Sequence, residues 1–309
     1  MAQEFYKAIV PGSTMLLGEH AVLFNGQAIV CAINKYLQVT LQVLAHSNSP
    51  ICTIVSPSLG TIEIKIDDFL VTQPFTFVLQ AIKLFSAELQ KLSCNIKLSI
   101  ESDFLSTIGF GSSSAVTVAI IAVIYKFINN SEIALEDLFI KSWQVIKMVQ
   151  KVGSGADVAA SIYGGVIAYN AKSYQVTQLP TIPNFYLIYS GYKTATPVVI
   201  EHVARLFKNE PAKLRQIYDA IEQTVLAGIK CIENTDYTKL HQIFDQAYSL
   251  QKQLQVSDEC LDQIVELAGS GTKISGSGLG DCIITFNQPT IEKYQVYPIQ
   301  VSTLGLQYV

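Results

Sequence analysis

The chain has 309 residues, enough for about two domains or one large one, and half of them are hydrophobic, which excludes disorder as its main character. Charged residues make up 15% of the chain, below the roughly 25% usual in soluble domains, and this indicates a compact body with much buried surface. The net charge of −4 provides no basic footprint, so we expect no nucleic-acid partner. The six cysteines form no C-x-x-C pair and the four histidines show no metal-ligand spacing, so neither a disulfide framework nor a zinc site is predicted.

Hydrophobic patterning predicts a mixture of strands and helices in the first half of the chain. The expected elements are one or two strands over 28–43, a hairpin over 50–66, a helix over 76–92, a strand over 95–100, helices over 115–128 and 135–149, and a strand over 165–169.

The second half continues with a strand over 185–189 and helices over 197–207, 211–232, 237–254 and 259–268. A Gly-rich loop then leads into a strand over 282–286. Turn-like segments at 170–173 and 179–183 suggest a boundary, and we therefore expect an α+β chain of two lobes, 1–175 and 176–309.

The most apolar helix, AVTVAIIAVIYKFI over 115–128, has 14 residues and includes Thr117 and Lys126. A membrane span needs about 20 apolar residues, so this helix is predicted to be buried in a core, and no membrane association is expected. The N-terminal MAQEFYKAIVPGS lacks the basic start and apolar run of a secretory signal. These features predict a cytoplasmic protein, and the apolar composition is compatible with a homodimer.

A Gly/Ser-rich stretch precedes the apolar helix, and its residues are Gly109, Phe110, Gly111, Ser112, Ser113 and Ser114. Glycines allow close approach of a ligand, and the N–H groups and dipole at a helix start favour an anion. The stretch therefore suggests a phosphate site, although a serine-capped helix after an ordinary turn would show the same local pattern. It is not a Walker loop, because no G-K-[ST] follows.

A second Gly/Ser-rich stretch, GSGADVAAS over 153–161, contains a lone carboxylate at Asp157. One interpretation makes Asp157 a base or a charge stabiliser beside a phosphate. The other makes it a helix N-cap, a position that aspartate favours.

Two further stretches are weak signals when taken alone. GTKISGSGLGDC over 271–282 is compatible with a hairpin or bulge as well as with ligand approach. PGSTMLLGEHAV over 11–22 places Glu19 and His20 after an apolar strand, where a turn with a solvated Glu is the simpler interpretation.

The order and co-occurrence of these stretches resemble the GHMP small-molecule kinases, a family that includes galactokinase, homoserine kinase, mevalonate kinase and phosphomevalonate kinase. Residues 11–26 resemble the first family motif, residues 109–114 the Gly-x-Gly-Ser-Ser second motif, and residues 275–282 the Gly-Ala-Gly-Gly-Gly third motif. The resemblance spans nearly the whole chain. It implies an N-terminal α/β lobe and a ferredoxin-like C-terminal lobe with the site between them.

The resemblance also implies ATP-dependent phosphorylation of a small molecule, with Mg²⁺. Residues 109–114 would wrap the ATP phosphates, with Ser113 at a metal or phosphate position, and Asp157 would lie near the acceptor oxygen. Residues expected at or near the substrate are Glu19, His20, Ser154, Gly155, Thr196, Gly276, Ser277 and Gly278. Phosphoryl transfer needs mainly positioning and charge neutralisation, which these groups can supply.

Two positions depart from the mevalonate kinase pattern. Ser13 stands where a lysine is usual, and Ile146, 11 residues before Asp157, stands where a metal-binding glutamate is usual. We therefore expect Lys151 or Lys193, which both lie beside substrate segments, to supply the missing positive charge.

The acceptor is left open between two compounds. The segment GEHAV over 18–22 and the short chain favour mevalonate, whereas KVGSGADVA over 151–159 and Gly280-Asp281-Cys282 look more like a phosphomevalonate kinase. A phosphorylated acceptor needs additional Lys or Arg, and the count of 21 basic residues points to mevalonate. Because two expected charges are missing, a catalytically weak relative that binds nucleotide or metabolite is the alternative of a different class.

Overall fold

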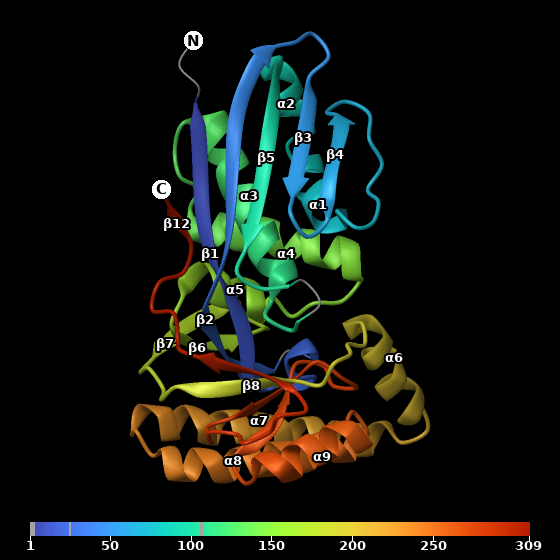
Figure 1. Ribbon diagram of the computed structural model, residues 1–309. Helices are drawn as coiled ribbons and strands as arrows, with labels where there is room; N and C mark the ends of the chain where they lie inside the picture. The colour runs from blue at the N-terminus through green and yellow to red at the C-terminus, as the bar shows by residue number, and fades with distance from the viewer. Residues whose placement is uncertain (1–3, 25, 106–107) are drawn as a thin grey trace.

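A computed structural model of the chain describes residues 4–24, 26–105 and 108–309. Its first part is built from a large sheet and five helices (Figure 1). The elements are β1 (Phe5–Leu17), the 3₁₀ turn η1 (Ala21–Phe24), β2 (Gln27–His46), β3 (Ile51–Ser56), β4 (Gly60–Lys65), α1 (Thr76–Lys83), α2 (Ser86–Leu92), β5 (Cys94–Ser102), α3 (Ser112–Asn129), α4 (Leu135–Gln150), α5 (Ala156–Tyr163), β6 (Val166–Asn170) and β7 (Gln175–Leu179).

The remaining elements form a smaller sheet with four helices, apart from the last strand, β12, which pairs with β1 in the large sheet. They are β8 (Phe185–Tyr189), α6 (Thr196–Leu206), α7 (Pro211–Glu233), α8 (Tyr237–Gln253), α9 (Glu259–Ala268), β9 (Thr272–Ser275), β10 (Cys282–Thr285), β11 (Gln295–Ile299) and β12 (Gln307–Tyr308). We call the eight-stranded sheet with α1–α5 the first lobe and the four-stranded sheet with α6–α9 the second lobe. They occupy opposite ends of the molecule in Figure 1.

The first sheet has the strand order β12-β1-β2-β5-β3-β4, with β6 on β2 and β7 on β6. All of its pairs are antiparallel except β3 with β5. The long strand β2 is single, where one or two strands were expected, and it carries β5 at one end and β6 at the other. The last strand, β12, returns to β1, so the chain crosses back to the first lobe; the proposed division near residue 175 stays a prediction.

The second sheet has the order β11-β8-β10-β9, with every pair antiparallel. In chain order these are the fourth, first, third and second strands, which is the order of a ferredoxin-like sheet. The connection from β10 to β11 contains no helix within its described residues 286–294. The expected α+β fold of two lobes is confirmed.

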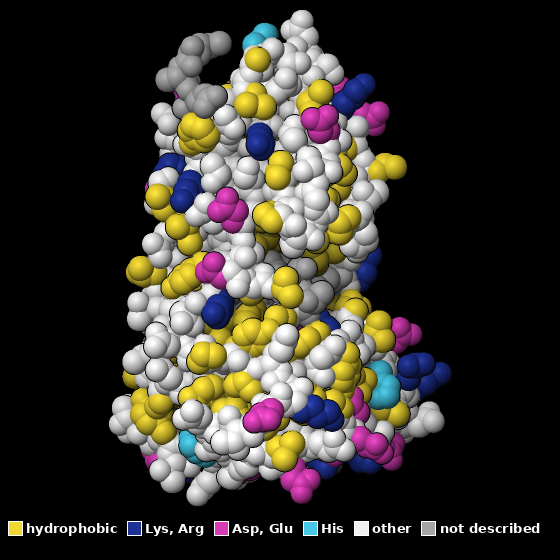
Figure 2. Space-filling model, viewed as in Figure 1, with side chains coloured by type: hydrophobic (Ala, Val, Ile, Leu, Met, Phe, Trp, Pro, Cys, Tyr) yellow, Lys and Arg dark blue, Asp and Glu magenta, His cyan; other side chains and the backbone are white. Residues whose placement is uncertain are grey.

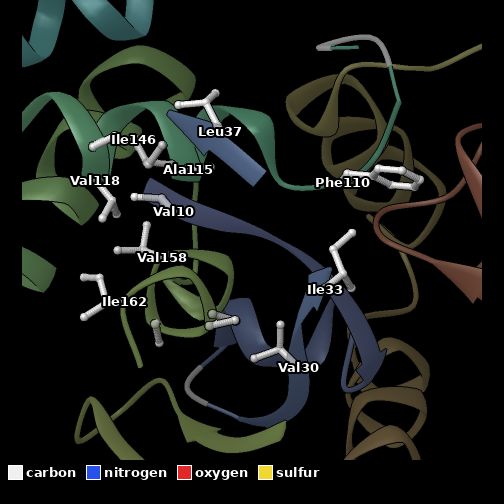
Figure 3. Packing of buried hydrophobic residues seen from close by; sticks show 14 of the residues in the cluster. Val10, Val30, Ile33, Leu37, Phe110, Ala115, Val118, Ile146, Val158 and Ile162 are labelled. Carbon is white, nitrogen blue, oxygen red and sulfur yellow. The ribbon is translucent and has the colours of Figure 1, made fainter. Parts of the chain in front are cut away.

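The apolar segment predicted to be a core helix is α3, which packs against β1, β2, α1, α4 and α5. Its residues from Ser114 to Ile124 are buried apart from Val116, because a helix that is apolar all round needs neighbours on every side. Figure 3 shows Val118 of α3, Val10 of β1 and Val158 of α5 pointing toward one another. Among the described residues α3 alone is long and apolar enough to cross a membrane, and 56% of it is buried inside the fold.

The single helix predicted over 76–92 is wrong, because the structure breaks it into α1 and α2. The Ser86 hydroxyl donates to the carbonyl of Lys83 at 3.2 Å. A serine side chain that takes a backbone carbonyl in this way competes with helical hydrogen bonding. Phe85, at the break, is buried with the core.

Candidate active site

A pocket of about 180 Å³ lies where segments of the two lobes meet. The first lobe lines it with the end of β1, the starts of α3 and α5 and part of α4, and the second lobe adds Lys193, the start of α6 and the loop after β9. On the face shown in Figure 2, hydrophobic side chains gather around the level where the lobes meet. The three Gly/Ser-rich stretches, far apart in the sequence, thus reach one cavity.

The stretch 109–114 enters the pocket as the beginning of α3. The helix begins at Ser112, with Gly111 as its N-cap. The three serines therefore form its first turn, whereas the sequence suggested that they precede the helix. The interpretation as a serine-capped helix is therefore wrong, because the cap has no side chain. The first N–H groups of a helix have no partner within the helix, and its dipole is positive there, which suits an anion.

Gly111 has a backbone angle that requires glycine, with φ of +68°. A Cβ at this position would overlap the hydroxyl of Ser13. Phe110, predicted to contact the cofactor, does not line the pocket: it is buried in the core, edge-on to Tyr297 at 5.2 Å between ring centroids. Its carbonyl accepts a 3.0 Å hydrogen bond from the Ser13 N–H, which ties this stretch to β1.

Asp157 lines the pocket as the second residue of α5. The N-cap of that helix is Gly155, so the interpretation of Asp157 as a cap is wrong. The Ser13 hydroxyl donates to Asp157 Oδ1 at 2.8 Å. Burial raises the pKa of the Asp157 carboxyl, and the carboxylates of Asp281 and Glu19 add to the rise, while the Ser13 hydrogen bond and Lys193 oppose it.

Lys193 lines the pocket and forms an ion pair with Asp281, with 3.1 Å between Nζ and Oδ2. The two residues belong to segments joined by backbone hydrogen bonds, from Ser190 N–H to the Asp281 carbonyl at 2.9 Å and from Asp281 N–H to the Tyr192 carbonyl at 2.8 Å. Asp281 Oδ1 is buried and has no hydrogen-bond partner among the described residues. Lys193 is thus held at the pocket from the second lobe.

Lys151, the other lysine expected near the acceptor, is exposed at the C-cap of α4 and is not among the pocket residues. Its backbone has φ of +65°, typical of the turn that ends a helix. Lys151 lies beside a substrate segment in the sequence, but it ends α4 and the chain turns before α5 begins. Of the two lysines, the structure brings only Lys193 to the pocket.

Glu19 and His20 line the pocket, and both are buried. The interpretation of Glu19 as a solvated turn residue is wrong, because it forms an ion pair with the buried Lys273 of β9. His20 Nε2 donates to the Ser277 carbonyl at 2.8 Å. Burial lowers the pKa of His20, against the opposing effects of this hydrogen bond and of Glu19, so the ring is neutral at pH 7.

The other expected substrate residues divide into two groups. Those that line the pocket are Ser154, Gly155, Thr196, Gly276 and Ser277. Gly278 lies in the same turn but not on the pocket, packed beside Val256. The stretch 271–282 is therefore the predicted hairpin, β9 to β10, and its turn also lines the pocket.

Both departures from the family pattern lie at the pocket. Ser13 is fully buried on Asp157, so a hydroxyl occupies the place where the pattern has a lysine. Ile146 lines the pocket from α4 and belongs to the hydrophobic core, near Ala115 of α3 (Figure 3). The Ile146 side chain is apolar and offers no metal ligand at this position.

A second pocket, of about 440 Å³, adjoins the first and shares Ser112 and Ser113 with it. Its walls are largely apolar, from Phe75, Phe77, Phe104 and other residues of the first lobe. Ser56, Ser58 and Glu101 add polar groups. The start of α3 therefore lies between a polar cavity with charged residues and a larger apolar one.

The family model of the GHMP kinases N terminal domain matches residues 76–165, which contain the start of α3 and Asp157. Curated relatives match over most of the chain: a mevalonate kinase of Aeropyrum pernix is 27% identical over 93% of this chain and 90% of its own, and one of Archaeoglobus fulgidus is 29% identical over 89% and 90%. The chain is thus similar to the GHMP kinases over residues 76–165, and to curated mevalonate kinases over most of its length.

Several solved structures share the fold at low identity. A mevalonate kinase of L. major in complex with R-mevalonate has a TM-score of 0.75 at 20% identity, over 96% of this chain and 95% of its own. A Streptococcus pneumoniae phosphomevalonate kinase in complex with phosphomevalonate and AMPPNP has a TM-score of 0.70 at 17% identity, over 93% of each chain. A protein of Listeria innocua has a TM-score of 0.82 at 21% identity, over 99% of each chain.

Sequence reasoning missed two residues that form ion pairs with residues of this pocket: Lys273 pairs with Glu19, and Asp281 pairs with Lys193. Lys273 lies in the short strand TKIS, whose four residues are all buried, and a charged side chain there needs a buried partner. Asp281 stands between Gly280 and Cys282 at the end of the Gly-rich turn, with φ of +71°. Neither partner could be identified from local spacing.

Proposed function

We propose that this protein is a GHMP kinase that transfers the γ-phosphate of ATP to the hydroxyl of mevalonate. The observation that carries the proposal is the position of Asp157 in the same pocket as the N-terminus of α3, 111–114. The relatives named mevalonate kinase support the choice of acceptor.

The nucleotide would lie across the two adjoining pockets. The base and ribose fit the larger, apolar cavity, and the triphosphate fits the start of α3, which is common to both pockets. The γ-phosphate then points toward the pocket that holds Asp157, Lys193 and Glu19. Residues Gly109, Gly111, Ser112, Ser113 and Ser114 would contact the phosphates.

The proposed Mg²⁺ fits the donors that the pocket offers. The described residues contain no group of three or more His, Cys, Asp or Glu side chains suited to a metal. Mg²⁺ bound with ATP needs few protein ligands, because phosphates and water supply the rest. Asp281 Oδ1, buried and unpartnered among the described residues, is an acceptor that a cation would satisfy, and the Ser113 hydroxyl and Asp157 carboxylate are the other donors. The ion would neutralise charge on the transferring phosphate.

Asp157 would accept the proton of the acceptor hydroxyl or stabilise the positive charge that gathers around it. Its raised pKa makes it a better base than an exposed aspartate, and the Ser13 hydroxyl fixes the direction of Oδ1. Lys193 would provide the positive charge that the family pattern places at position 13. In this arrangement the lysine approaches from the second lobe, held by Asp281.

Mevalonate is favoured over phosphomevalonate by the charges of the pocket. Lys193 is the single Lys or Arg among its described lining residues, and it is already paired with Asp281. Three carboxylates, those of Glu19, Asp157 and Asp281, line the same space. A second phosphate on the acceptor would therefore meet negative charge without a free cation.

The test is ADP release from ATP with each acceptor supplied separately, together with an Asp157→Asn variant. We expect turnover with mevalonate, less than a tenth of it with phosphomevalonate, and at least about a hundredfold loss of kcat in the variant. The opposite preference would make the protein a phosphomevalonate kinase. Nucleotide binding without ADP release on either acceptor would support the weak, ligand-binding relative instead. A cytoplasmic location and a homodimer stay predictions.

A further inference from the structure

The two lobes are joined beside the pocket by a row of buried polar contacts. Thr14 Oγ1 and Ser275 Oγ are 2.8 Å apart, and Ser275 Oγ also donates to the Met15 carbonyl at 3.0 Å. The His20 bond to the Ser277 carbonyl continues this row of contacts between β1 and the strand β9 with its following turn. We call this row the interlobe seam.

The charged contact of the interlobe seam is the ion pair of Lys273 with Glu19, which no family motif considered above assigns. The side chain of Lys273 is 0% exposed and that of Glu19 is 5% exposed. Nζ of Lys273 donates to Glu19 Oε1, and it also lies 5.6 Å from the ring centroid of Phe244. Lys273 itself does not line the pocket, whereas Glu19 does.

A pair of this kind is costly to bury, since desolvation removes much of the Coulombic gain, and apolar replacements of a buried pair are often neutral or stabilising. Burial accordingly lowers the pKa of Lys273, while Glu19 opposes this effect. The pair is therefore a poor way to gain stability alone. Its position suggests that it orients Glu19, because Lys273 holds Oε1 while the Glu19 side chain lines the pocket.

We propose that Lys273 is a positioning residue that fixes the Glu19 carboxylate at the acceptor end of the pocket. This inference rests on the proposed function, because the acceptor is the ligand that reaches Glu19. The ammonium acts from the second lobe on a pocket residue of the first, so acceptor binding depends on the interlobe seam. The ATP subsites at α3 are not part of this contact.

The test compares Lys273→Met with Lys252→Met as the matched control. Lys252 also pairs with a carboxylate, Asp262 at 3.0 Å, and lies 5.7 Å from the ring of Tyr248, but its side chain is 52% exposed. We expect Lys273→Met to raise the KM for the acceptor at least about tenfold and to leave the KM for ATP within about twofold, since only acceptor binding uses Glu19. Lys252→Met should leave both values unchanged.

A double variant, Lys273→Met with Glu19→Gln, separates positioning from folding. It leaves no unpaired buried charge, so we expect it to unfold within a few degrees of the wild type and still to show a raised acceptor KM. If Lys273→Met does not fold, the acceptor KM of the double variant tests the proposal instead. The proposal would be overturned if either folded variant kept the acceptor KM of the wild type, or if its KM for ATP rose as much as its KM for the acceptor.

The proposed function and the proposed role of Lys273 can be tested independently of each other. Calorimetric titration of mevalonate into the same proteins gives the acceptor affinity without turnover. Wild-type protein that binds mevalonate but releases no ADP contradicts the proposed function, while the affinity change in Lys273→Met still decides the role of Lys273. If the wild type turns over phosphomevalonate instead, the same comparison is made with that acceptor.

Discussion

Single side chains decide the chemistry of this pocket, and Asp157 depends on the hydroxyl of Ser13. That hydrogen bond is one of the two influences that lower the pKa of Asp157 against the larger effect of burial. A hydroxyl lowers the pKa of a neighbouring carboxyl less than a positive charge does. Asp157 is therefore more basic than a carboxylate paired with a lysine would be. This is the physical consequence of finding Ser13 where the family pattern has a lysine.

A Ser13→Ala variant tests this dependence. Removing the donor raises the pKa of Asp157 further, and because a base acts only when deprotonated, the acidic limb of kcat/KM should move to higher pH. Turnover on the plateau above that limb should fall by no more than about tenfold, since Asp157 remains. The measurement is a pH profile of kcat/KM, and an unmoved or lowered limb would contradict the role given to Ser13.

The same pKa shift has a consequence for stability. Asp157 has a raised pKa in the folded protein, so its protonated form is favoured there. Its contribution to the free energy of unfolding is therefore fully present below the unfolded pKa and is lost as the pH rises through the folded pKa. Asp157 thus favours folding in acid and opposes it at neutral pH, which is a cost tolerated for the site.

Whole elements place these side chains, and α3 is the most important of them. Its apolar surface packs against both β1 and α5, the elements that carry Ser13 and Asp157. Thr117 donates to the Ser113 carbonyl at 2.7 Å within the same helix. The three serines are thus presented on a rigid helix start and not on a loop.

A Ser113→Ala variant tests the nucleotide site on this helix. We expect ATP affinity to fall by about five- to tenfold, with acceptor affinity within about twofold, because one hydroxyl donor to phosphate or metal is removed. Titration calorimetry with each ligand measures both. Ser86→Ala is the control, since Ser86 also begins a helix, α2, but contacts neither pocket. Greater loss of acceptor than of nucleotide affinity would mean that the phosphate site is misplaced.

Most elements could be predicted from the sequence because their patterns are local. The alternating strand over 95–100 and the helix over 135–149 depend on periodicities that act within a few residues, and the structure confirms both. The break between α1 and α2 was missed, since it depends on one serine hydroxyl and on the burial of Phe85. Periodicity alone cannot distinguish a continuous helix from two helices that share an apolar face.

The site residues that lie in sequence motifs could be predicted. Those that form ion pairs with residues far away in the sequence could not. The three Gly/Ser-rich stretches indicated a phosphate site, and they do line one pocket. The partner of Glu19 lies 254 positions away in the sequence, at Lys273, and only the packing of the two sheets brings them together. Lys151 was expected at the site because it lies beside a substrate segment in the sequence, although at the C-cap of α4 its side chain is exposed.

The molecule as a whole joins two sheets around a pocket that neither could form alone. The first lobe supplies the helix starts and Asp157, and the second supplies Lys193, Asp281 and the turn after β9. The main hydrophobic cluster also includes residues of both sheets, such as Ile29 and Leu187. The separation between the phosphate site and the acceptor site is therefore set by how the lobes pack.

A structure of the protein crystallised with a non-hydrolysable ATP analogue and mevalonate tests the central claim most directly. We predict that the β- and γ-phosphates lie within hydrogen-bond distance of the backbone N–H groups at the start of α3, with an Asp157 oxygen on the mevalonate hydroxyl. A triphosphate bound elsewhere, or an Asp157 carboxylate directed away from the acceptor, would contradict this account.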